Sequence, residues 1–280
     1  MLKYLYQALN VQKEEEAPVI LLLGRGFFMG IFLAAYQVTA ESLFDTLSDR
    51  IAEGILVSGA LGIFSTALFT YLQGKLRFSF LVVLNDLVIF LLTVLLFVFY
   101  SVFPIFPQEY VVFAMFALIG PIIAVLLLSF WGVFGRIFDL RQSKRIIGGI
   151  DTGQLSAAII TFFAIAALER FIPEFNSFPT ENFLVVGAIS LVFSFFFMTR
   201  IVGKYDLNIV KREFESATMK SSFQQFFSNN YILLLAAFMI LSTAIYWFLE
   251  NAYLSVLYEQ YQSESELRAF LGLFNGSILV

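Results

Sequence analysis

The chain has 280 residues, of which 60% are hydrophobic and 14% charged, so it is far more apolar than soluble domains, which average roughly 45–50% apolar and 25% charged residues. A soluble fold is therefore excluded, and lipid must cover much of the surface. The absence of Cys and His excludes disulfides, Cys/His zinc sites and imidazole chemistry, and the net charge of −4 without a basic stripe excludes nucleic acid as a partner. We expect no metal and no cofactor.

Seven apolar segments are long enough to cross a membrane, whose hydrocarbon core of about 30 Å needs about 20 helical residues. They are residues 18–44, 52–74, 77–103, 109–138, 153–172, 182–203 and 231–258. The first is not a cleaved signal peptide, because the preceding stretch QKEEEAP is acidic. The sequence therefore predicts an all-α polytopic membrane protein that retains residues 1–17 as an N-terminal segment.

A polar stretch, residues 205–230, separates the sixth and seventh segments. Four aromatic side chains recur in it at near-helical spacing, namely Phe214, Phe223, Phe226 and Phe227. This pattern predicts a short amphipathic helix at the membrane interface. After the seventh segment, residues 267–280 are apolar but too short to cross, so we expect a partial eighth helix in which the chain ends.

Positive charges lie mainly on one side of the predicted spans, which places that side in the cytoplasm. Thirteen of the seventeen Lys and Arg residues are there: Lys3, Lys13, Lys75, Arg77, Arg136, Arg141, Lys144, Arg145, Arg200, Lys204, Lys211, Arg212 and Lys220. The other side has Arg50, Arg170 and Arg268, and Arg25 lies within the first span. We expect a multi-pass protein of the inner (cytoplasmic) membrane with a cytoplasmic N-terminus.

An internal repeat relates the beginning of the chain to its end, although chance matches are an alternative in a chain so rich in Phe. At a shift of about 210 residues, Phe28-Met29 matches Phe238-Met239, Tyr36 matches Tyr246, and Leu61–Phe64 matches Leu271–Phe274. Residues 231–280 would then begin a second bundle, a copy of the start of the first. This predicts a six-helix bundle over 18–204, a cytoplasmic linker over 205–230, and helix 7 with a partial helix 8 over 231–280.

Six helices, a charged linker and further helices resemble the major facilitator superfamily. The stretch FWGVFGRIFDLRQSKRIIGGIDTGQLSAAIITFF, from Phe130 to Phe163, is similar to the loop between helices four and five of the bacterial and plastid ATP/ADP translocases and their bacterial relatives. It has an aromatic-Trp pair, then Gln142 to Arg145, then a helix that starts with small residues. The first span, GFFMGIFLAAYQVTAESLF, also resembles that group. The resemblance implies a carrier. Its expected partners are the second-half helices, which are missing here, or cytoplasmic domains.

Two charged side chains are predicted to lie deep in the membrane. Arg25 lies seven residues after Pro18, about 10 Å into the hydrocarbon, and Asp86 lies ten residues after Leu76, about 15 Å deep. Arg25 could contact an anion or extend toward the headgroups. Asp86, which follows Asn85, could pair with Arg25, carry a coupling proton or face a water-filled cavity.

Polar and aromatic side chains mark the outer ends of the first and seventh spans. If the repeat holds, Glu41 and Tyr36 form one cluster, and Glu250 and Tyr246, with Asn251 beside them, form its counterpart near an outer gate. The alternative is that these residues anchor the helices at the interface.

Charges of both signs follow the fourth span. They are Arg136, Asp139, Arg141, Lys144 and Arg145. They could close a cytoplasmic gate between the two halves, or they could hold the loop in the cytoplasm and bind lipid headgroups.

We therefore expect a facilitator-type carrier that works by alternating access, with the lipid bilayer and a small-molecule solute as partners. Because only Arg25 is a buried cation, whereas a carrier of ATP or ADP needs several, the expected substrate is an organic anion or a nucleotide-like solute. The alternative is a non-transporting scaffold or sensor. We do not expect an enzyme, because no carboxylate pair or Ser with a base falls at productive spacing.

Overall fold

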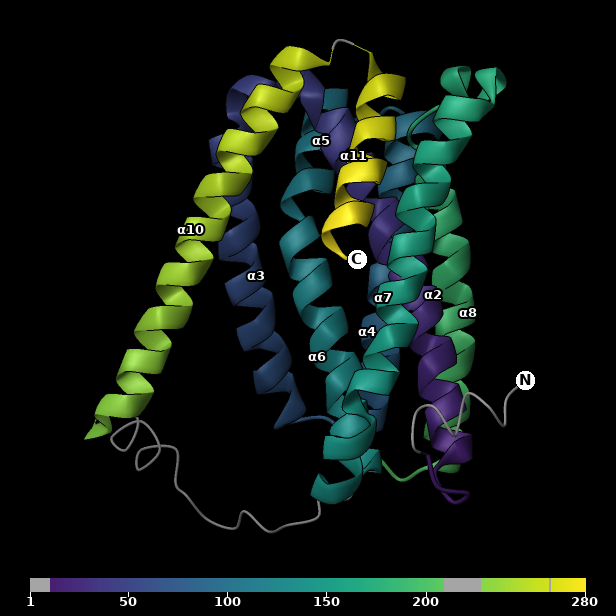
Figure 1. The fold of residues 1–280 in the computed structure, drawn as a ribbon, viewed down its shortest axis with the longest axis vertical. Coiled ribbons are helices and arrows are strands. Elements are labelled where there is room, and N and C mark those ends of the chain that lie inside the picture. Colours follow the sequence, from purple (N-terminus) through teal and green to yellow (C-terminus); the bar gives the residue numbers. More distant parts are fainter. Residues whose placement is uncertain (1–10, 209–227, 262) are drawn as a thin grey trace.

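The computed structural model describes residues 11–208, 228–261 and 263–280. The described residues form helices and no strand (Figure 1). The predicted amphipathic helix, with its four Phe residues, lies almost entirely outside the described residues.

The helices follow one another in the order that hydrophobicity predicts. They are α2 (Glu16–Leu43), the 3-10 helix η1 (Phe44–Arg50), α3 (Ile51–Gln73), α4 (Phe78–Phe97), the π-helical turn η2 (Val98–Val102), α5 (Gln108–Ala117), α6 (Ile119–Ile137), α7 (Leu140–Phe171), the 3-10 helix η3 (Pro173–Ser177), α8 (Asn182–Lys204), α10 (Asn230–Gln260) and α11 (Glu264–Ile278). Six helical segments are long and apolar enough to cross a membrane. The first of them, Glu16–Gln73, bends at η1 and contains two of the predicted spans. The all-α membrane fold is thereby confirmed.

Two predicted boundaries differ from the structure. The helix expected to begin at residue 153 begins at Leu140, because Asp139 accepts hydrogen bonds from the backbone N–H groups of Arg141 and Gln142 in a capping box. The span expected at 109–138 is divided at Leu118 into α5 and α6. The division lies just before Pro121, which has no backbone N–H to continue a helix.

Helix α2 is the centre of the bundle, packed against α7 on one side and α8 on the other. A glycine allows the first of these contacts, because a Cβ atom on Gly30 would lie 2.3 Å from the backbone oxygen of Gln154 in α7. Around this core, α3 packs against α6 and α4 packs against α8. Close helix approach at small residues is typical of membrane bundles.

The last two helices meet the bundle in different ways. Helix α11 packs along α7, whereas α10 contacts mainly α3 and η1. The buried residues of α10 are Leu254, Leu257 and Tyr258, all near its C-terminal end. Figure 1 shows this end beside the start of α11 and the other end of α10 leaning away from the bundle. We call the end of the molecule where η1 and the turn between α10 and α11 lie the η1 end.

Candidate functional site

A buried ion pair joins three helices of the bundle. Nη2 of Arg25, from α2, lies 3.2 Å from Oδ1 and 3.3 Å from Oδ2 of Asp86, from α4, and donates to Oγ of Ser129, from α6, at 2.8 Å. Arg25 is fully buried and Asp86 almost so. The two side chains that the rise per residue placed at similar depths are thus in direct contact.

This contact compensates the charge of Arg25 from within the protein. The remaining guanidinium nitrogens, Nε and Nη1, have no hydrogen-bond partner among the described residues, and the ring of Phe130 lies 5.9 Å away. Four cavities of the described residues have linings that do not include Arg25. A role of Arg25 in anion contact and a role of Asp86 in proton coupling both stay predictions.

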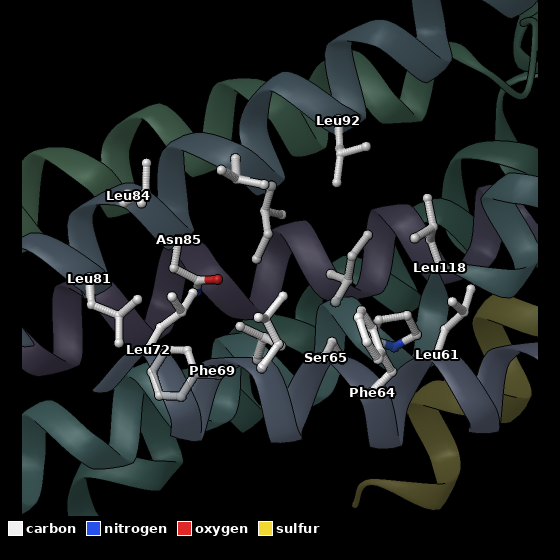
Figure 2. A pocket seen from close by; sticks show the side chains of 16 residues that line it. Leu61, Phe64, Ser65, Phe69, Leu72, Leu81, Leu84, Asn85, Leu92 and Leu118 are labelled. Atoms are coloured by element: carbon white, nitrogen blue, oxygen red, sulfur yellow. The ribbon is translucent and has the colours of Figure 1, made fainter. Parts of the chain in front are cut away.

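Asn85 faces a different space, an apolar cavity of about 340 Å³ between α3, α4 and α6. Figure 2 shows the Asn85 amide among leucine and phenylalanine side chains, including Leu72, Phe69 and Leu81. Ser65 is the other polar residue of the lining. The buried Nδ2 atom of Asn85 has no hydrogen-bond partner in the described part of the chain. With no charged lining residue, this cavity suits an apolar group.

A second cavity, of about 320 Å³, lies near the η1 end between α2, α3, α6 and α10, and we call it the carboxylate cavity. Its lining residues are Gln37, Glu41, Ser58, Phe116, Ile119, Gly120, Ile123, Ala124, Tyr246, Trp247 and Glu250. Three residues that the repeat singled out, Glu41, Tyr246 and Glu250, are therefore brought together from opposite parts of the chain. Such a volume is at the lower end of the range for small-molecule sites, roughly 300–1,000 Å³.

Glu41 is the most enclosed of these three residues, with 3% of its surface exposed. Its carboxylate accepts hydrogen bonds from Nε2 of Gln37 at 2.7 Å and from Nδ2 of Asn275 at 3.4 Å. Its backbone oxygen accepts a bond of 2.6 Å from the hydroxyl of Tyr258. Glu41 thus connects α2 to both α10 and α11.

Two other predicted residues lie outside this cavity. Tyr36 is buried and donates to the backbone oxygen of Met115 at 2.9 Å, which ties α2 to α5. The backbone oxygen of Asn251 accepts from Oγ of Ser255 at 2.8 Å within α10. The structure does not bring either residue to the lining.

A polar network that the sequence analysis did not single out joins α11 to the bundle. Nε of the buried Arg268 donates to Oε1 of Glu169 in α7 at 2.8 Å, and its Nη1 donates to the backbone oxygen of Phe178 at 3.0 Å and to Oγ1 of Thr180. The Thr180 hydroxyl in turn donates to Glu264 at 2.7 Å. The sequence could have predicted this network, because Arg268 lies near the start of an apolar helix and an arginine in such a position needs a buried partner.

The predicted gate residues after the fourth span contact their own bundle. Arg145 pairs with the buried Glu15 at the start of α2. The guanidinium of Arg136 lies 3.4 Å from the ring centre of Phe78, and its Nη1 donates to the backbone oxygen of Gly132. Asp139 caps α7, and Arg141 and Lys144 are exposed. These contacts support the helix ends; a gate between the two halves stays a prediction.

Comparison with known proteins adds no relative: no protein-family model, no curated protein and no solved structure matches this chain.

Proposed function

We propose that this membrane protein is a facilitator-type carrier that works by alternating access, and that the conformation described here is closed at the η1 end. The observation that carries the proposal is where the polar contacts between α10–α11 and the bundle lie. They join Tyr258 and Asn275 to Glu41, Arg268 to Glu169, and Glu264 to Thr180. These four contacts connect segments that are far apart in the sequence, and together they hold α10 and α11 against the bundle at that end.

The opposite half of α10 supports the same proposal because, among the described residues, it makes no such polar contact with the bundle. Its large apolar side chains are exposed, among them Leu234, Phe238 and Ile240. A helix held at one end and free along the rest is suited to a rocking movement about the held end. By the distribution of Lys and Arg, the η1 end is the outer side, so the conformation would be open toward the cytoplasm.

The nature of the solute is a separate matter. The predicted organic anion or nucleotide-like solute depended on Arg25 as its contact. Because Asp86 already compensates Arg25, the geometry gives this substrate class no support, and it stays a prediction.

A distance measurement distinguishes a carrier from a static scaffold. The chain has no Cys, so spin labels can be placed at Leu140→Cys in α7 and Leu234→Cys in α10 without background. Both positions are exposed, by 77% and 71%. They lie near the starts of α7 and α10, which Figure 1 shows at the end opposite η1. In proteoliposomes, double electron–electron resonance should give two distance populations, and Arg268→Ala should shift their ratio.

The control variant is Arg170→Ala, which removes an exposed arginine of α7 and should leave the ratio unchanged. A single distance population that Arg268→Ala does not alter would favour the scaffold and contradict the carrier.

A further inference from the structure

The carboxylate cavity contains two carboxyl groups and no basic side chain among the described residues. Its lining includes Glu41 and Glu250. The two carboxyl groups come from α2 and α10, so they line one cavity from the two parts that the proposed carrier would move.

Three arginines of the described helices pair with carboxylates outside the cavity, and none of the three lines it. Arg25 pairs with Asp86, Arg50 with Glu53, and Arg268 with Glu169. The hydrogen-bond donors to the Glu41 carboxylate are neutral amides. A buried carboxyl group is stable when it is protonated or when it has a counter-charge, so a bound cation would stabilise the charged form of these two side chains.

The wall of the cavity indicates which kind of cation. Tyr246 and Trp247 line it from α10 and Phe116 from the α5 side, and the two α10 rings lie edge to face with centres 5.5 Å apart. Aromatic faces attract ammonium groups, and Trp does so most strongly. A hard metal ion such as Ca²⁺ requires six to eight oxygen ligands, which this largely apolar and aromatic lining does not offer.

We propose that the carboxylate cavity binds an organic cation of the ammonium class between Glu41 and Glu250, with Tyr246 and Trp247 against its apolar surface. As the substrate of a carrier, this assignment rests on the proposed function; as a binding site it does not. Because one carboxylate comes from each moving part, a bound cation would hold α10 against α2.

A binding experiment uses the two tryptophans of the chain. Trp131→Phe leaves Trp247 as the only one, so its fluorescence reports on the cavity wall. Purified protein titrated with tetraethylammonium chloride at constant ionic strength should show a saturable change that sodium chloride does not produce. Glu250→Gln, and likewise Glu41→Gln, should weaken the affinity by at least about tenfold, which corresponds to about 1.4 kcal/mol, because each variant removes a contact to a charged group.

The matched control is Glu259→Gln, which neutralises an exposed carboxylate of the same helix and should not change the affinity. Glu250→Gln is the decisive variant if Glu41→Gln fails to fold, because Glu41 supports the contacts between three helices. No saturable change with tetraethylammonium, an equal change with sodium, or an affinity that Glu250→Gln leaves intact overturns the proposal. Binding together with a single spin-label distance keeps the cation site and rejects the carrier.

Discussion

Arg25 and Asp86 lie 61 positions apart in the chain, and their side chains meet at 3.2 Å in the interior of the bundle. Both are removed from solvent, so each depends on the other for compensation of its charge. The pair therefore makes α2 and α4 dependent on each other.

Removal of one partner should cost much more than removal of both. Asp86→Ala leaves a buried guanidinium without a counter-charge, and we expect a loss of about 3–5 kcal/mol in the free energy of unfolding in detergent. The double variant Arg25→Met with Asp86→Leu replaces the pair by apolar side chains and should recover most of that loss. If the double variant is as unstable as the single one, the pair does not act as a unit.

Asp86→Asn tests the role in proton coupling through a transport measurement. An amide retains the shape of the carboxylate but does not titrate. Uptake of labelled tetraethylammonium into proteoliposomes with an imposed pH gradient is the measurement. If Asp86 only holds Arg25, uptake should keep its dependence on the gradient; loss of that dependence with uptake retained would indicate that Asp86 carries the proton.

The network around Arg268 should hold α11 and α10 closed at the η1 end. Arg268→Ala removes the donor to Glu169 and to Thr180, and leaves the Glu169 carboxylate buried without its partner. We expect Leu254→Cys, at a fully buried position of α10, to react with a water-soluble maleimide several times faster in that background. Arg170→Ala is the control, and an equal rate in both backgrounds would show that the network does not hold the end closed.

The contact between α11 and α7 depends on a residue without a side chain. A Cβ atom on Gly272 would lie 2.6 Å from the backbone oxygen of Phe162. Gly272→Val should therefore separate the two helices and destabilise the protein by about 1–3 kcal/mol. Gly59→Ala is the control, because no atom lies within 4 Å of its added methyl group, and it should be neutral or stabilising by up to about 1 kcal/mol. Thermal unfolding in detergent measures both variants.

The capping box of α7 supports only the start of this helix, so its loss should lower the stability of the protein by a small amount. Asp139→Ala removes the acceptor for the N–H groups of Arg141 and Gln142 and should lower stability by about 0.5–2 kcal/mol. Asp139→Ser should retain most of the cap. If alanine and serine behave alike in thermal unfolding, the capping box does not hold the start of this helix.

The sequence by itself determined the solvent of this protein, the segments that cross it and the depth of each side chain along them. The length of an apolar run and a rise of 1.5 Å per residue are sufficient for that, and they brought Arg25 and Asp86 to similar depths. The repeat also singled out Glu41 and Glu250 without any information on which helices are neighbours. Local signals were weaker, and the cap at Asp139 went unnoticed.

Only the tertiary structure decided which side chains at one depth face one another. Rotation of each helix about its axis and the choice of neighbours are set by packing at positions such as Gly30 and Gly272, where backbones approach closely. That packing gave Arg268 its partner Glu169, and it placed Glu41 and Glu250 around one cavity while Tyr36 was turned away into the core. The depth of a side chain follows from its position along one helix, whereas a binding site depends on the contacts between several helices.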